Sequence, residues 1–172
     1  MSKSLTKIID SAAIKDKVKE LSYMISTDYK NLNPVMIGVL NGCYIFLSDL
    51  TRNMEIIHEI DFIKISSYRN GSTSGEIRLI HDINIDISGR DIVIVDDIID
   101  TGKTLDFLKK HFEKYGVNSI KTCAIVCRKV SKDPKPIIEY KGFEIDDGFL
   151  IGYGMDYSGW GRNLKDIYII ED

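Results

Sequence analysis

Three carboxylates and two threonine hydroxyls lie within nine residues in the middle of the chain. Asp96 and Asp97 follow the apolar run 92–95, and residues 100–104 read Asp-Thr-Gly-Lys-Thr. The backbone N–H groups of a glycine-bearing turn that opens a helix form a concave site for a phosphate. Carboxylates repel a phosphate, but they can accept hydrogen bonds from ribose hydroxyls or bind Mg²⁺. The pattern therefore predicts a site for a phosphorylated sugar.

A buried strand must position these acids. Residues 92–95 are β-branched throughout, which is typical of a parallel strand buried on both faces, and the apolar residues of 105–112 recur at roughly helical spacing. We expect the strand to end at the two acids, where an open α/β sheet binds its ligands. A nucleotide-triphosphate P-loop is excluded because Asp97 stands where its first glycine belongs. A solvated acidic turn without a ligand remains the structural alternative.

A second strand–turn–helix unit has the same form. The apolar run 35–40 leads through Asn41-Gly42-Cys43 into the helical stretch 44–50, which makes a second candidate anion site. The polar segment 66–75 cannot bury itself, so we expect either a mobile lid or a solvated hairpin tip. The remaining expected elements are helices at 14–29 and 105–115 and strands at 55–67, 77–80, 119–127 and 167–170.

The composition describes a globular chain. It has 172 residues, of which 44% are hydrophobic and 28% charged, enough for one domain with a core of its own. The net charge of -3 gives no general attraction to nucleic acid, and no apolar run reaches the length of a membrane span or of a signal-peptide core. The three cysteines lack Cys-x-x-Cys spacing, and Cys123 and Cys127, in or at the end of an apolar strand, are expected to be small buried residues. The odd number of cysteines and their lack of paired spacing fit a reducing cytoplasm.

Residues 95–102 resemble the phosphoribosyl-pyrophosphate (PRPP) binding motif of the phosphoribosyltransferases. That motif consists of an apolar strand, two acids, two apolar residues, Asp-Thr-Gly and a further Thr. Over residues 34–170 the chain is similar to the purine salvage group of the type I family, the hypoxanthine or hypoxanthine-guanine phosphoribosyltransferases. The blocks that carry the resemblance are 39–42 (Val-Leu-Asn-Gly), 66–68 (Ser-Ser-Tyr), 95–102, 152–157 (Gly-Tyr-Gly-Met-Asp-Tyr) and 161–164 (Gly-Arg-Asn-Leu).

The resemblance implies an α/β fold. Its mostly parallel twisted sheet would carry helices on both faces, with a small hood over the base site. The core would span about 34–130 and the hood would combine the N-terminal segment with about 140–172, all within one domain of residues 1–172. The lid loop would lie at about 66–76. Family members are usually homodimers or homotetramers, without nucleic-acid or membrane partners.

The reaction implied by the resemblance is transfer of the 5-phosphoribosyl group from PRPP to hypoxanthine, and to guanine, giving IMP or GMP and pyrophosphate, with two Mg²⁺ ions. Asp100 would be the catalytic acid or base at purine N7, and the lid would contribute Ser67 and Tyr68. The residues implied for PRPP are Asp96, Asp97, Asp100, Thr101, Gly102, Lys103 and Thr104; for pyrophosphate, Leu40, Asn41, Gly42 and Arg162; and for Mg²⁺, Asp96, Asp97 and Asp156.

The base site is implied at Arg128, Lys129, Phe149, Leu150 and Asp156. The Phe149 ring would stack on the purine and the Leu150 backbone would read its edge. From the residues alone, Phe149 is equally a core aromatic, Asp156 a turn acid, and Arg128-Lys129 an exposed basic turn.

Two positions depart from the family pattern. Many relatives have Lys or Arg at Asn41, and the family lysine that contacts the purine 6-oxo group aligns with Arg128, with Lys129 next. An arginine fork differs from a lysine point charge, so base preference stays open. The alternatives are an enzyme that prefers xanthine or another base, and a regulator of the same fold that senses PRPP or a nucleotide.

Overall fold

The larger of two sheets has six strands and a mostly parallel arrangement. The computed structural model describes residues 4–68, 76–129 and 136–171. The strand order is β4-β3-β2-β5-β6-β7, and only β4 runs antiparallel to its neighbour. The bounds are β2 (Val35–Leu40), β3 (Glu59–Tyr68), β4 (Glu76–His81), β5 (Asp91–Ile99), β6 (Ser119–Arg128) and β7 (Tyr140–Ile145).

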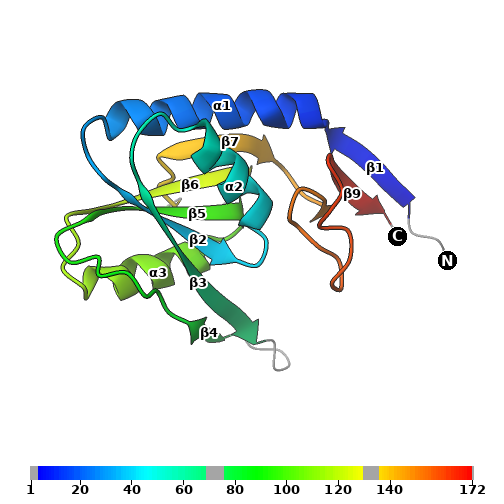
Figure 1. The fold of residues 1–172 in the computed structure, drawn as a ribbon. Helices are drawn as coiled ribbons and strands as arrows, with labels where there is room; N and C mark the ends of the chain where they lie inside the picture. Colours follow the sequence, from blue (N-terminus) through cyan, green and yellow to red (C-terminus); the bar gives the residue numbers. More distant parts are fainter. Residues whose placement is uncertain (1–3, 69–75, 130–135, 172) are drawn as a thin grey trace.

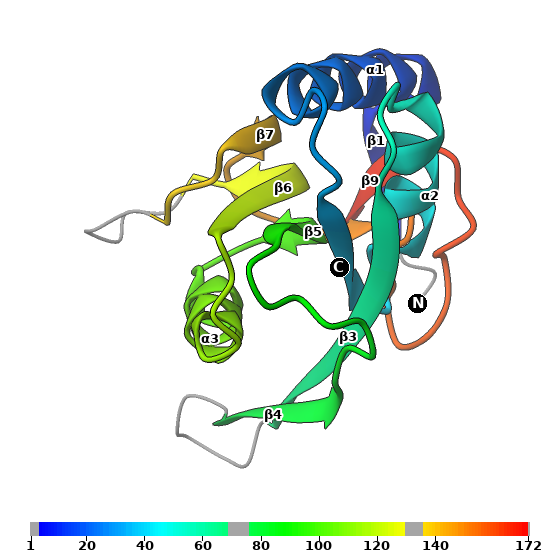
Figure 2. The same cartoon turned by 60° about the vertical axis from the view of Figure 1, so that its left-hand side comes forward.

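Helices cover both faces of this sheet (Figures 1 and 2). α1 (Ser11–Asp28) and α2 (Tyr44–Asn53) lie on one face, and α3 (Lys103–Glu113) lies on the other. α1 turns the apolar side of its amphipathic pattern to the sheet, and Asp10 caps it by accepting a 2.8 Å hydrogen bond from the Ala13 amide. Each face has its own buried cluster, so the predicted α/β fold class is confirmed.

β5 is longer than its apolar run predicts. The expectation that it ends at Asp96 and Asp97 is wrong, because its pairing with β6 continues to Ile99 opposite Cys127. The two acids therefore lie within the last part of a strand, where their backbone is held by a neighbouring strand rather than by a loop.

A smaller antiparallel sheet brings the two ends of the chain together. It consists of β1 (Ser4–Ile9), β9 (Ile167–Glu171) and β8 (Phe149–Ile151), in that order. Figure 1 shows it beyond the carboxyl ends of the parallel strands, next to the segment that joins β8 to β9. The sequence did not predict β1. β7, at 140–145, extends the larger sheet, although the expected hood begins at about residue 140.

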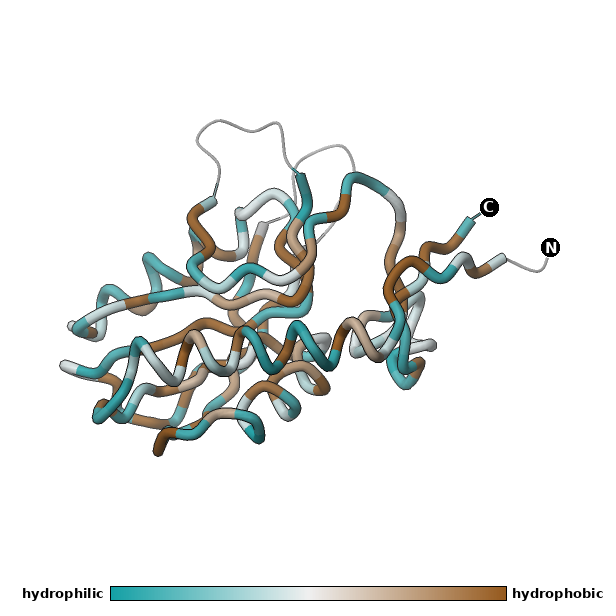
Figure 3. The backbone as a smooth tube through the Cα atoms, turned by 90° about the horizontal axis from the view of Figure 1, so that it is seen from above, coloured by the Kyte–Doolittle hydropathy of each residue, from teal (hydrophilic) through white to brown (hydrophobic). Residues whose placement is uncertain are grey.

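Hydropathy follows this layering. In Figure 3 the hydrophobic stretches run along the strands, while α1 alternates between polar and apolar residues along its length. Cys123 and Cys127 are buried, as predicted, and Cys43 is buried as well; all three thiols are free. Within the described residues, no helix is long and apolar enough to span a membrane.

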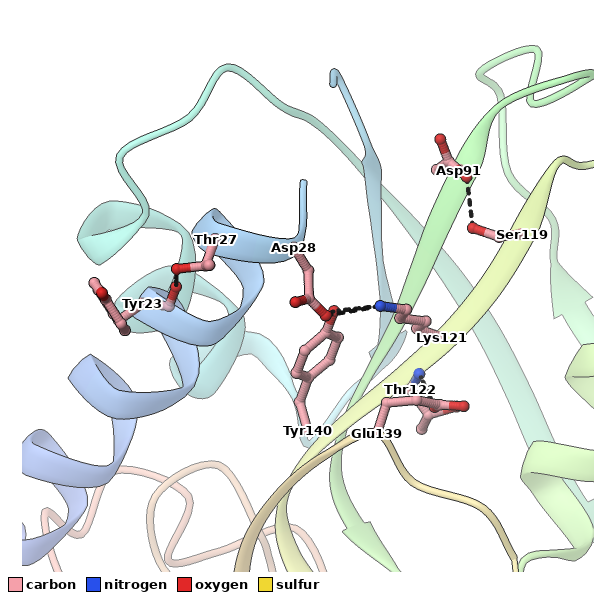
Figure 4. Close-up of polar contacts among 9 residues, drawn as sticks. All are labelled: Tyr23, Thr27, Asp28, Asp91, Ser119, Lys121, Thr122, Glu139 and Tyr140. Atoms are coloured by element: carbon pink, nitrogen blue, oxygen red, sulfur yellow. Dashed lines mark hydrogen bonds and ion pairs between the residues drawn. The ribbon is translucent and has the colours of Figure 1, made fainter. Parts of the chain in front are cut away.

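A polar cluster near the amino ends of the strands ties α1 to the sheet (Figure 4). The Lys121 Nζ and the Tyr140 hydroxyl each donate a 2.7 Å hydrogen bond to Asp28 Oδ2 at the end of α1. The same Nζ lies 5.3 and 5.4 Å from the ring centroids of Tyr29 and Tyr140. The hydrogen bond from Lys121, and then the one from Tyr140, lowers the pKa of Asp28 below its ordinary 3.8.

We predict that Lys121→Met lowers the free energy of unfolding by about 1–2 kcal/mol at pH 7, because it removes a partly exposed ion pair and two cation–π contacts. A lowered carboxyl pKa stabilises the fold above pH 3.8, and this contribution is lost as the pH falls through the folded-state pKa. The difference from wild type should therefore shrink at acid pH. Urea titrations at several pH values measure it, with Lys30→Met at an exposed position as the control. Equal losses in the two variants would contradict a role for the cluster.

Candidate functional site

The site lies at the ends of two neighbouring strands, β2 and β5, whose following helices cover opposite faces of the sheet. From β2 the chain passes through α2 to β3 on one side, and from β5 it passes through α3 to β6 on the other. β2 and β5 are neighbours, so their carboxyl ends flank a crevice that no crossover covers, the usual ligand site of such sheets. β2 ends at the cis peptide bond between Leu40 and Asn41, and the last part of β5 carries the two acids.

Glycines let three segments meet at this crevice. A Cβ atom at position 42 would overlap the Asp97 carboxylate, so the turn after β2 packs directly on an acid of β5. A Cβ atom at position 154 would overlap the carbonyl oxygen of Gly42, and Gly154 has a φ of 102°. The predicted pyrophosphate turn and the segment between β8 and β9 are therefore in contact through their backbones.

The two acids of β5 are partly buried side by side. Asp96 Oδ1 accepts a 3.0 Å hydrogen bond from the Asp97 amide, and Asp97 Oδ1 accepts one of 2.9 Å from the Ile98 amide. Burial, together with the neighbouring Asp97 charge, raises the pKa of Asp96 well above its ordinary value. Burial also raises the pKa of Asp97, although the charge of Arg162 opposes this. Within the described residues neither acid forms a salt bridge, which suits the pair to a cation or to hydroxyl donors.

The predicted phosphate turn lines a cavity of about 300 Å³ together with Asp96. Gly102 has a φ of 77° and precedes α3, and the Asp106 amide donates to its carbonyl oxygen, so the turn opens directly into the helix. Asp100, Thr101 and Lys103 are exposed at this cavity. The residues of the predicted PRPP site that line it are Asp96, Asp100, Thr101, Gly102, Lys103 and Thr104.

Arg162 lies on the opposite side of the crevice and is held by its own segment. Its guanidinium forms a 2.5 Å ion pair with Asp156 and donates a 2.7 Å hydrogen bond to the carbonyl oxygen of Gly154. Asp156 also accepts a 2.7 Å hydrogen bond from the Gly159 amide. Arg162 and Asp156, predicted for pyrophosphate and metal, are thus paired with each other here.

Aromatic side chains mark the predicted base region. Phe149 is 53% exposed at the start of β8, which rules out the reading as a core aromatic. Its ring lies edge-on to Tyr157 at 5.3 Å, and Tyr157 lies edge-on to Trp160 at 5.8 Å. Leu150 is buried, and its backbone pairs with β9.

The two basic residues at the end of β6 have different surroundings. Arg128 donates through Nη2 to the carbonyl oxygen of Gly148, and its Nη1 is buried with no hydrogen-bond partner among the described residues. Lys129 is exposed and pairs with Asp146 at 3.0 Å. Arg128 therefore contacts the residue before Phe149 and keeps a free donor, whereas Lys129 points to the surface.

Two parts of the predicted site remain without structural detail. Ser67 and Tyr68 end β3 opposite Ile77 and Glu76 of β4, and their side chains are outside the description. The expected lid loop between the strands lies outside the described residues over 69–75.

Sequence reasoning missed two contributors. Tyr157 holds the Phe149 ring, and Gly154 carries the contact to Gly42. The glycine and aromatic density of 152–161 was the available signal. Among the described residues, no group of three or more acidic, histidine or cysteine side chains could hold a metal alone. A metal here would need ligands from the substrate as well as from the two acids of β5.

Comparison with known proteins agrees with this geometry. Residues 4–158 match the family model of the phosphoribosyl transferase domain. The chain is 36% identical to a hypoxanthine-guanine phosphoribosyltransferase of Aquifex aeolicus, covering 99% of this chain and 97% of the relative, and 36% identical to that of Bacillus subtilis, covering 95% and 92%. A crystal structure of the Bacillus anthracis enzyme superimposes with a TM-score of 0.91 at 37% identity, over 96% of this chain and 98% of the other.

The fold, the family model and relatives matched over nearly their whole length agree with the resemblance read from residues 95–102. The chain therefore belongs to the phosphoribosyltransferase family, in the group that contains the hypoxanthine-guanine phosphoribosyltransferases.

Proposed function

We propose that this chain is a purine salvage enzyme that transfers the 5-phosphoribosyl group from PRPP to hypoxanthine and guanine, giving IMP or GMP and pyrophosphate. The observation that carries the proposal is one cavity lined by Asp96 and by the phosphate-type turn 100–104, at the switch point of the sheet. Such a site matches a ligand that has a phosphate at one end and sugar hydroxyls at the other.

Each part of PRPP has a complementary group. The 5′-phosphate would sit on the backbone amides and hydroxyls of 101–104, and the ribose hydroxyls would donate to Asp96 and Asp97. The pyrophosphate would lie on the turn 40–42, near Arg162. Arg162 would have to exchange part of its pairing with Asp156 for the pyrophosphate oxygens.

The acid pair also fits Mg²⁺. Two adjacent, partly buried carboxylates without a salt bridge among the described residues are hard oxygen ligands of the kind that Mg²⁺ prefers. Mg²⁺ held by Asp96 and Asp97 together with PRPP would offset the charge of the departing pyrophosphate. The number of ions, including the second one assigned to Asp156, is part of the proposal.

The chemical step exchanges one bond at C1 of the ribose for another. The bond from C1 to the pyrophosphate oxygen breaks, a purine ring nitrogen forms the new bond, and the transition state has oxocarbenium character. Asp100 is exposed at the cavity beside the phosphate turn, and it would take or give the proton at purine N7. Ser67 and Tyr68 would help the lid exclude water, which would otherwise attack C1.

The base would stack on Phe149, whose exposed ring is braced by Tyr157. Aromatic stacking on a base contributes about 1–3 kcal/mol. Arg128, not Lys129, would read the 6-oxo group, because its Nη1 is a buried donor without a partner while Lys129 is paired at the surface. The Leu150 backbone would read the remaining edge. A homodimer or homotetramer and a cytoplasmic location stay predictions from the resemblance.

The test of the proposal is turnover of hypoxanthine, guanine, xanthine and adenine, each with PRPP and Mg²⁺, followed by ultraviolet absorbance. We expect nucleotide from hypoxanthine and guanine, and none after chelation of Mg²⁺. Preference for xanthine would mean that Arg128 has changed base selection. Tight PRPP binding without turnover of any purine would favour another base or the regulator.

Asp100→Asn is predicted to lower kcat by about 10²–10⁴-fold, because the amide cannot exchange the N7 proton. KM for PRPP should change by less than about 3-fold, since the phosphate turn stays intact. Steady-state kinetics with hypoxanthine measure both values, and Asp16→Asn, an exposed acid on α1, is the matched control. Turnover equal to wild type would remove Asp100 from the chemistry.

Arg128→Gln is predicted to raise KM for hypoxanthine by about 10-fold or more, because a 6-oxo oxygen loses a charged donor worth roughly 1.5–3 kcal/mol. Lys129→Gln should leave KM within about 2-fold, since its surface ion pair contributes little. The two variants remove the same charge from adjacent residues of one strand end. A larger effect from Lys129→Gln would reverse the assignment.

A further inference from the structure

A cavity that lies apart from the candidate active site has a volume of about 560 Å³. It lies between the first half of α1, the outer side of α2 and the segment that joins β8 to β9. In Figure 1 these elements meet on the sheet face opposite α3. The volume falls within the usual range of small-molecule sites, roughly 300–1,000 Å³.

The floor of this cavity is apolar and its rim is cationic. Lys15 of α1, Arg52 of α2 and Lys165 of the third wall are exposed on the rim. None of these three has an ion pair or side-chain hydrogen bond within the described residues. The only carboxylate in the lining, Asp49, accepts a 2.7 Å hydrogen bond from the Tyr153 hydroxyl. The apolar floor consists of Ile14, Val18, Ile45 and Leu164.

This arrangement suits a ligand with an apolar planar part and several negative charges. The floor would take the planar part, and three cations from three different elements can share the charges of a polyphosphate more readily than those of a single phosphate. Two amides and a hydroxyl, from Asn53, Asn163 and Ser11, complete the lining and match ribose hydroxyls or a base edge.

We propose that the cavity is a second binding site, for a nucleoside polyphosphate. It is separate from the PRPP cavity, since the two share no lining residue.

The walls of the second site continue into the candidate active site. The Tyr153 amide donates to the Leu164 carbonyl oxygen at 2.8 Å, and both residues line the cavity. The next rung of the same turn is the 3.0 Å hydrogen bond from the Gly154 amide to the Arg162 carbonyl oxygen. α2, the second wall, begins directly after the pyrophosphate turn 40–42. A ligand in this cavity would therefore contact the two segments that continue into Arg162 and Gly42.

The test uses the only tryptophan of the chain, Trp160, which lies on the segment between β8 and β9 and is 46% exposed. Its fluorescence is titrated with ATP and with GTP, in the absence and in the presence of saturating PRPP and Mg²⁺ but without a purine base. We expect a saturable change that persists at saturating PRPP. Inorganic triphosphate has only the polyphosphate that the cations would bind, and adenosine has only the base and ribose. Each should bind at least about 10-fold more weakly than ATP.

The matched variants are Arg52→Gln/Lys165→Gln in the cavity and Lys30→Gln/Lys114→Gln at exposed positions elsewhere. Loss of two surface charges corresponds to about a 10-fold weaker Kd. We expect this loss of affinity only in the cavity variant. Its turnover of hypoxanthine in the absence of added ATP or GTP should equal that of wild type.

Several outcomes would overturn the second site. Competition between the nucleotide and PRPP would place the nucleotide in the active site. Equal effects of the two double variants, or no saturable binding of ATP or GTP at millimolar concentration, would remove the site. A change of sedimentation coefficient in the cavity variant alone would assign the surface to a second copy of the chain.

Discussion

The packing of the Gly42 backbone against the Asp97 carboxylate is the contact on which the candidate site depends. It brings the turn after β2 into the crevice beside β5, so that a pyrophosphate turn and a sugar-binding acid can meet the same ligand. The contact leaves no room for a side chain at position 42. Gly154 then closes on Gly42 from the other side. Two glycines and one acid thus join three segments that lie far apart in the sequence.

Much of this arrangement could be predicted from local patterns. The β-branched run 92–95 predicted the buried strand, and the residues after it predicted the phosphate turn. Both signals lie within a few consecutive residues. The length of β5 could not be predicted, since Asp96 and Asp97 have poor strand propensity and are held in the strand by pairing with β6. Tertiary pairing overrode propensity at these two residues.

Contacts between distant segments were beyond local patterns. β1 has mostly exposed side chains, and its partner β9 lies at the other end of the chain, so no local periodicity marks it. The choice between Arg128 and Lys129 was open for a similar reason. Arg128 ends β6 and Lys129 follows it, and only the position of Gly148, the residue before the exposed Phe149 ring, shows which of the two is next to the base region.

The charges around the crevice explain why a divalent cation belongs to the proposed reaction. Four carboxylates, at positions 96, 97, 100 and 156, gather there with the cations Arg162 and Lys103, and Arg162 is paired with Asp156. PRPP adds further negative charge. The family resemblance implies a lysine or arginine at the position of Asn41 in many relatives, and this chain has the neutral Asn41 there. In the proposed reaction Mg²⁺ would therefore offset a larger share of the repulsion between carboxylate and phosphate than in a relative with a basic residue at that position.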